Sequence, residues 1–200
     1  SLSASYTQNQ LVPENERLHL GFEYSYSNWS FFSGLNQAYF YDLFGPQKSS
    51  RKGYEVGLSF SETLISDSPL KSGYSLSSSW YGNLFTLPDY QNIRASYSEY
   101  LSVSGSFYYQ YLTASLGAID YEKGYKFQIS SRNNYVNGLL IPRLYSDLSY
   151  GFPFVLKNSS IWLRGSIGYS FGKKDEPFAN FYFGSFGNNW VDYTNQKQFR

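Results

Sequence analysis

Cysteine is absent from this 200-residue chain, and charged residues make up only 16% of it. Without cysteine the chain can have no disulfide framework, thiolate metal site or cysteine nucleophile. The 16 Lys and Arg against 15 Asp and Glu leave a net charge of +1 and form no basic stripe, so we expect no nucleic-acid partner. The sequence also lacks the run of 18 or more apolar residues that a membrane-spanning helix needs.

The residues that carry most enzyme chemistry are scarce as well. One histidine, His19, and no cysteine exclude the usual zinc ligand sets, and the acidic loop residues lack calcium-site spacing. The sequence contains neither a Gly-x-Ser-x-Gly element nor a Walker phosphate loop. His19 lies two pleats from Glu23, which would suit a hydrolase base but more often indicates a hydrogen-bond network. We expect no enzyme activity, cofactor or metal, and nominate no catalytic residue.

Aromatic residues, at 22% of the chain, alternate with small and polar residues at a period of two. Between Arg17 and Ser27 the even positions are all apolar, and the odd positions are polar, charged or glycine. Successive side chains of a strand point to opposite faces, so this segment predicts a strand with one apolar and one polar face. The pattern recurs along the chain without a helical period, which predicts a single all-β domain over residues 1–200.

Turn-forming residues between the alternating runs set the predicted strand boundaries. Inside the long unbroken run from Ile93 to Ile119, Gly105 is the predicted turn. We expect about nine or ten strands, at approximately 1–7, 17–27, 29–41, 53–64, 72–86, 93–104, 106–120, 124–133, 139–152 and 160–172.

A soluble sandwich and a membrane barrel both bury one strand face, so alternation alone leaves both open. Strand length favours the barrel, because about 9–11 tilted residues cross a bilayer and these runs are that long. Composition favours it too: β-branched residues fill soluble β cores, whereas tyrosine suits a membrane interface with its ring in lipid and its hydroxyl in water. We therefore expect an antiparallel up-and-down transmembrane β-barrel.

Charged residues inside the predicted strands fall on the polar phase. A cation facing lipid near mid-bilayer costs about 2–4 kcal/mol, so a membrane barrel keeps its charges on the inner face. Lys126 follows this rule, and Glu99 is the exception because it shares the phase of its apolar neighbours. The predicted lumen charges are Glu23, Glu55, Arg143, Asp147 and Arg164.

Residues 196–200, Gln-Lys-Gln-Phe-Arg, lie in a polar stretch, and nothing strand-like is predicted after Tyr193. A complete barrel closes its last strand on its first, because an open edge in lipid leaves backbone groups unpaired. We therefore expect a partial barrel, a segment of a larger one.

A family resemblance centres on residues 159–193. This segment reads Ser-Ser-Ile-Trp-Leu-Arg-Gly-Ser-Ile-Gly-Tyr-Ser-Phe-Gly, followed after a charged loop by Pro-Phe-Ala-Asn-Phe-Tyr-Phe-Gly-Ser-Phe-Gly-Asn-Asn-Trp-Val. It resembles the late strands of the bacterial surface-antigen outer-membrane barrel superfamily, which comprises outer-membrane assembly factors and two-partner-secretion transporters. Phe181, Tyr182, Phe183 and Gly184 match the family's aromatic-aromatic-Leu-Gly-Gly element, with Ser185 where the second glycine is usual. Residues 188–193 lack the arginine of the family's Val-Arg-Gly-aromatic lumen motif.

The resemblance implies a barrel with more strands than this chain shows, and a loop that folds back into the lumen. The glycines of this segment allow the chain to turn inward, and its rings could form an aromatic plug. A girdle of aromatic side chains followed by a surface loop is the alternative. The predicted lumen-loop element is Phe181, Tyr182, Phe183, Gly184, Gly187 and Trp190.

Together these observations predict a protein of the bacterial outer membrane that contacts lipid and acts in assembly or translocation of macromolecules. Periplasmic domains or partner proteins are its candidate partners. Two alternatives remain open at this point. One is a passive pore or structural barrel, and the other is a soluble β-sandwich or barrel that binds a ligand.

Overall fold

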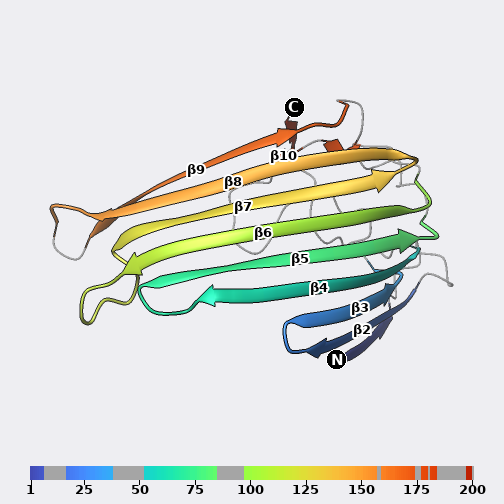
Figure 1. Ribbon diagram of the computed structural model, residues 1–200, viewed down its shortest axis with the longest axis horizontal. Helices are drawn as coiled ribbons and strands as arrows, with labels where there is room; N and C mark the ends of the chain where they lie inside the picture. The colour runs from blue at the N-terminus through green and yellow to red at the C-terminus, as the bar shows by residue number, and fades with distance from the viewer. Residues whose placement is uncertain are drawn as a thin grey trace.

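The computed structural model describes residues 1–6, 17–37, 52–84, 97–156, 159–173, 177–179, 181–183 and 197–199. Most of them form one nine-stranded sheet, in which each strand pairs with its neighbours in the chain (Figure 1). Every pairing is antiparallel, so the predicted all-β, up-and-down topology is confirmed. The strands are β1 (Leu2–Tyr6), β2 (Leu18–Tyr26), β3 (Trp29–Leu35), β4 (Tyr54–Ile65), β5 (Leu70–Gly82), β6 (Tyr100–Thr113), β7 (Lys123–Val136), β8 (Leu139–Pro153) and β9 (Ser160–Ser170).

The two ends of the sheet differ in their connections. Residues 27–28, 66–69, 114–122 and 154–159 connect strands at one end, which we call the short-loop end (left in Figure 1). At the other end, the long-loop end, lie the connections 36–53 and 83–99 and the tight turn 137–138. Asn137 and Gly138 have φ values of 48° and 78°, the left-handed conformation that a two-residue β-hairpin turn requires.

The predicted turn at Gly105 is wrong. β6 runs without a break through this residue, and Gly105 pairs with Leu76 on one side and Ser131 on the other. A Cβ atom here would lie 3.1 Å from Leu76 Cδ2, so the glycine makes room for a neighbouring side chain. β6 begins at Tyr100, later than predicted, and Glu99 therefore precedes the strand.

The prediction that nothing strand-like follows Tyr193 is also wrong. β11 (Lys197–Phe199) pairs antiparallel with β10 (Phe181–Phe183), and the two form a separate small sheet. A short 3₁₀ turn, η2 (Pro177–Ala179), precedes β10. Only three residues pair on each strand, which is why alternation gave no signal.

The nine-stranded sheet is open in the described part of the chain. β1 and β9 are its edge strands, and they do not pair with each other. The predicted barrel is therefore observed only as an open antiparallel sheet. No helix among the described residues is long and apolar enough to cross a membrane.

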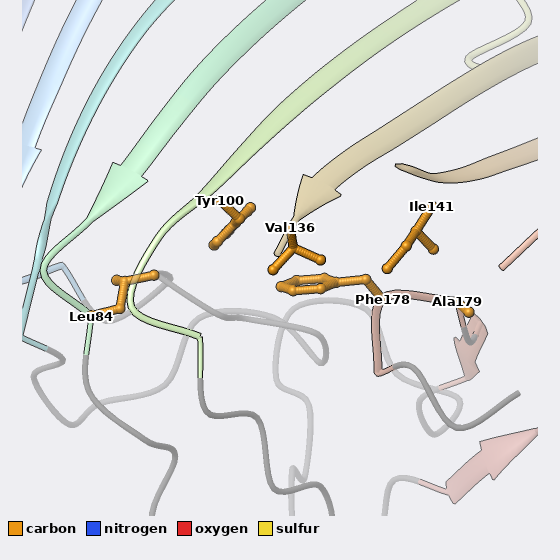
Figure 2. Packing of buried hydrophobic residues seen from close by; sticks show 6 residues of the cluster. All are labelled: Leu84, Tyr100, Val136, Ile141, Phe178 and Ala179. Carbon is orange, nitrogen blue, oxygen red and sulfur yellow. The ribbon is translucent and has the colours of Figure 1, made fainter. Parts of the chain in front are cut away.

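The buried hydrophobic cluster is small and lies at the long-loop end of the sheet. Phe178 of η2 lies beneath the ends of the strands, among side chains that the sheet supplies (Figure 2). The members of this buried cluster are Leu84, Tyr100, Val136, Ile141, Phe178 and Ala179.

Candidate functional site

The strand register divides the sheet residues into two faces, because residues paired across neighbouring strands lie on the same face. One row runs through Tyr24, Phe31, Leu58, Ser78 and Val103, and its face is called the apolar face below. The adjacent row runs through serine alone on five strands, and its face is called the polar face. That row is Ser25, Ser30, Ser59, Ser77 and Ser104.

The apolar face is exposed rather than packed into a core. Leu58, Ile129 and Ile167 are 45%, 44% and 76% exposed, although all three are large and aliphatic. From β2 to β9 only two charged residues lie on this face, Glu62 and Lys123, both toward the short-loop end. The Glu62 carboxylate accepts a hydrogen bond of 2.8 Å from the Tyr74 hydroxyl.

Aromatic residues lie toward both ends of the apolar face, with aliphatic residues between them. On β4, Tyr54 and Phe60 flank Val56 and Leu58. On β5 the flanking residues are Tyr74 and Trp80, and on β7 they are Tyr125 and Tyr135. At the short-loop end the rings contact one another across strands: the Trp29 and Phe60 centroids are 4.8 Å apart, and those of Tyr111 and Tyr125 are 6.0 Å apart.

The polar face carries serine, glycine and charged side chains. Serine hydroxyls hydrogen-bond across it, at 2.8 Å between Ser75 and Ser106 and 2.7 Å between Ser77 and Ser104. The register places all five predicted lumen charges on this face: Glu23, Glu55, Arg143, Asp147 and Arg164.

Charge on the polar face is unevenly divided between the two halves of the sheet. β2 to β4 contribute Glu23 and Glu55, together with His19. β5 to β9 contribute the single carboxylate Asp147 and five cations. Lys71 and Arg132 were not among the predicted lumen charges. Lys71 precedes the predicted strand 72–86, whereas Arg132 lies within the predicted strand 124–133, where its parity matches that of Lys126. The five cations are Lys71, Lys126, Arg132, Arg143 and Arg164.

Aromatic rings on the polar face lie over glycines of neighbouring strands. A Cβ atom at Gly57 would come within 2.2 Å of the Phe32 ring, and one at Gly151 within 2.5 Å of the Trp162 ring. Tyr108 covers Gly73 in the same way, at 2.9 Å for its ring. These glycines therefore allow large rings to lie flat on the sheet where any side chain would displace them.

Residues 177–179 and Phe181 lie against the polar face at the long-loop end. The Phe178 ring centroid lies 4.9 Å from that of Tyr100, and the side chain is buried in the cluster of Figure 2. The Phe181 ring lies over Gly168 of β9, with the Arg143 guanidinium 5.7 Å from its centroid. Tyr182 and Phe183 follow in β10, whereas Gly184, Gly187 and Trp190 lie outside the described residues.

No family model, curated protein or solved structure matches this chain. The resemblance to surface-antigen barrels therefore rests on residues 159–193 alone.

His19 has a structural role in the described part of the chain. Its side chain is buried, and its Nδ1 is hydrogen-bonded to the backbone carbonyl of Asn36. Glu23 lies four residues farther along β2, or about 13 Å at the rise of a strand, so the two do not meet as an acid–base pair. No group of three metal-ligating side chains occurs among the described residues.

Proposed function

We propose that this chain forms part of the wall of a β-barrel in the bacterial outer membrane, with its apolar face toward lipid and its polar face toward the interior. The observation that carries this proposal is the separation of charge between the two faces. Between β2 and β9, only Glu62 and Lys123 are charged on the apolar face, and both lie toward one end. A lipid-facing surface must exclude charge near mid-bilayer, whereas a water-facing surface has no such need.

The exposure of side chains on the apolar face also supports a lipid environment for that face. Exposed apolar area costs about 25 cal/mol per Å² in water, so a sheet-wide surface of large aliphatic and aromatic side chains calls for an apolar solvent or a partner. A soluble β protein would bury these side chains in a common core. Instead, the buried cluster of the described residues is confined to the long-loop end and draws on the polar face.

The positions of the aromatic residues fit the same orientation. Tyrosine and tryptophan favour the two membrane–water interfaces, and aliphatic side chains favour the hydrocarbon between them. Tyr74, Leu76 and Trp80 follow this order along β5. Strands of 11 to 15 residues from β4 to β9 are long enough to cross a bilayer, which takes about 9–11.

The barrel would need strands beyond these nine. The free edges of β1 and β9 carry backbone groups that cannot stay unpaired in hydrocarbon. We propose that further strands complete the cylinder, as in a larger barrel.

The activity that we propose is assembly or translocation of macromolecules at the outer membrane, as in surface-antigen barrels. Phe178 and Phe181 support it, because they pack on the face that we assign to the interior. Phe178, in the buried cluster, and Phe181, over Gly168, anchor η2 and β10 to the sheet. Because neither element belongs to the nine-stranded sheet, both can be displaced without unfolding it, which is what an internal gate requires. A passive pore is the second candidate, favoured by the excess of cations on the polar face of β5 to β9.

Charge placement on adjacent residues of β7 tests the membrane assignment. Ile129→Arg puts a cation on the apolar face near mid-strand, and we expect it to oppose insertion by about 2–4 kcal/mol. Gln128→Arg adds the same side chain one residue away on the polar face, and should insert as the parent does. Insertion is read from heat-modifiable gel migration after folding into phospholipid vesicles. Equal insertion of the two variants would contradict the assignment, and so would a parent that stays in the aqueous phase when the strands that complete the cylinder are present.

Conductance of the inserted protein separates a gated translocation barrel from a passive pore. Phe178→Ala removes the ring that buries η2 against the sheet, and we expect it to raise steady conductance or its fluctuations. A parent channel that is already steadily open and unchanged by this substitution would favour the passive pore.

A further inference from the structure

Three cations form one transverse row on the polar face near the short-loop end. The register pairs Lys71 of β5 with Gln110, Gln110 with Lys126, Lys126 with Ser149, and Ser149 with Arg164 of β9. Cation and neutral residue therefore alternate across five strands. Neighbouring strands lie about 4.8 Å apart, so successive cations start about 10 Å from one another.

These three cations have no protein partner in the part of the chain that the structure describes. The Lys71 and Lys126 ammonium groups and the Arg164 guanidinium make no hydrogen bond or ion pair there. Asp147 is the only carboxylate on the polar face of β5 to β9, and its Oδ1 accepts a 2.5 Å hydrogen bond from the Ser166 hydroxyl. The polar face of β5 to β9 therefore carries an excess of positive charge that an anionic ligand can neutralise.

A hollow of about 430 Å³ lies over the middle of this row. Amide and hydroxyl groups line it beside Lys126, and these can donate hydrogen bonds to anionic oxygens. The lining includes Tyr108, Gln110, Lys126, Gln128, Asp147 and Ser149.

We propose that this row is a binding site for small anionic solutes that carry carboxylate or phosphate groups, which pass along the polar face from one cation to the next. The proposal rests on the proposed function, because it takes the polar face as a water-filled interior. Lys71 and Lys126 are in the same row with one neutral residue between them, and Arg164 offers a planar fork that matches two anionic oxygens. The cations are exposed, so binding is weak and exchange is fast, as a transit site requires.

Trp162 is a built-in reporter for this site. It lies on the polar face two residues before Arg164, about 7 Å along β9, with its ring over Gly151. A full-length chain in which Trp29, Trp80 and Trp190 are replaced by phenylalanine leaves its emission as the only tryptophan signal. Iodide is the anionic quencher, and acrylamide is the neutral quencher that measures access alone.

The expected result is a loss of iodide quenching when cations of the row are removed. At about 10 mM ionic strength, Lys126→Gln and Arg164→Gln should each lower the iodide quenching constant about twofold, and both together about fourfold. Acrylamide quenching should not change, and the differences should vanish near 1 M salt. Inorganic phosphate and acetate should each protect Trp162 from iodide in the parent but not in the double variant.

Lys123→Gln is the matched control, because it removes the same charge three residues from Lys126 on the other phase of β7. It should leave iodide quenching within experimental error of the parent. The proposal would be overturned if the iodide quenching constant does not change when Lys126 and Arg164 are replaced, or if neither phosphate nor acetate protects Trp162 from iodide in the parent. Failure of vesicle insertion with the quenching pattern intact would instead count against the membrane function and leave the anion site standing.

Discussion

The ring of Phe181 lies over Gly168, and this contact ties the small β10–β11 sheet to the polar face of the large one. A Cβ atom on Gly168 would come within 2.9 Å of Phe181 Cζ, so the contact depends on the missing side chain. The Arg143 guanidinium lies 5.7 Å from the centroid of the same ring, close enough for a cation–π attraction.

Gly168→Leu should therefore release β10 from the polar face without unfolding the nine-stranded sheet. A leucine side chain occupies the space of the Phe181 ring and forces it away, while the strand backbone can accept any residue. We expect amide hydrogen exchange in residues 178–179 and 181–183 to accelerate at least about tenfold, with β7 and β8 unaffected. Gly165→Leu is the control on the same strand, because nothing lies within 4 Å of a Cβ atom there. Equal exchange in the two variants would show that the ring contact does not hold the segment.

Asn36→Ala should destabilise the long-loop end of β2 to β4. The Asn36 amide donates to the Leu18 carbonyl at 3.1 Å and its Oδ1 accepts from the Gly53 N–H at 3.2 Å, in a buried position. Its φ of 51° is also one that alanine adopts poorly. Loss of both hydrogen bonds together with this backbone penalty should lower the free energy of unfolding by about 2–4 kcal/mol.

The matched control for that substitution is Asn137→Ala. Asn137 has nearly the same backbone conformation, with φ of 48°, but is exposed in a turn. The Asn137→Ala substitution should lower the free energy of unfolding by only about 1 kcal/mol, which is the backbone penalty by itself. Denaturant unfolding of the detergent-folded protein measures both, and equal losses would mean that the buried hydrogen bonds of Asn36 add nothing.

The connection between β6 and β7 should loosen at acid pH through Glu122. Hydrogen bonds from the Ser115 side chain and then from its backbone N–H, which is 2.9 Å from Glu122 Oε2, hold the pKa of this carboxyl below its usual 4.5. Because the folded pKa is the lower one, the contribution of the carboxylate is fully present above pH 4.5 and is lost as the pH falls through the folded pKa.

Amide exchange at Ser115 measures this loss, and Glu122→Gln should remove its pH dependence. Asp120→Asn changes a neighbouring charge in the same connection and should leave Ser115 protection as it is in the parent. A Glu122 carboxyl that titrates at or above 4.5 by NMR would contradict the assignment.

Period-two parity predicted more of the structure than any motif did. It separated Glu23, Glu55, Arg143, Asp147 and Arg164 from the leucine and tyrosine positions, and the register places all five on one face. Parity works because a strand side chain can point only to one of the two faces of the sheet, and residues paired across neighbouring strands point to the same face.

Local signals failed where the outcome depended on a neighbour. Gly105 resembles a turn residue in the sequence, but its role is to make room for Leu76 of the next strand. The β10–β11 pair is too short to alternate visibly, and its register pairs Phe181 with Phe199, which is more than a dozen residues away in the sequence. Neither relation can be read within a single strand.

The order of residues along each strand determined by itself that this protein is a β-sheet with one charge-poor face, because alternation needs no knowledge of which strands are neighbours. Only the tertiary structure decided which side chains stand in the same row. The alignment of Lys71, Lys126 and Arg164 depends on how far each strand slides against the next, and backbone hydrogen bonding alone permits many such registers. The docking of Phe181 on Gly168 was decided in the same way, since it needs the last strands folded before there is a surface to dock on.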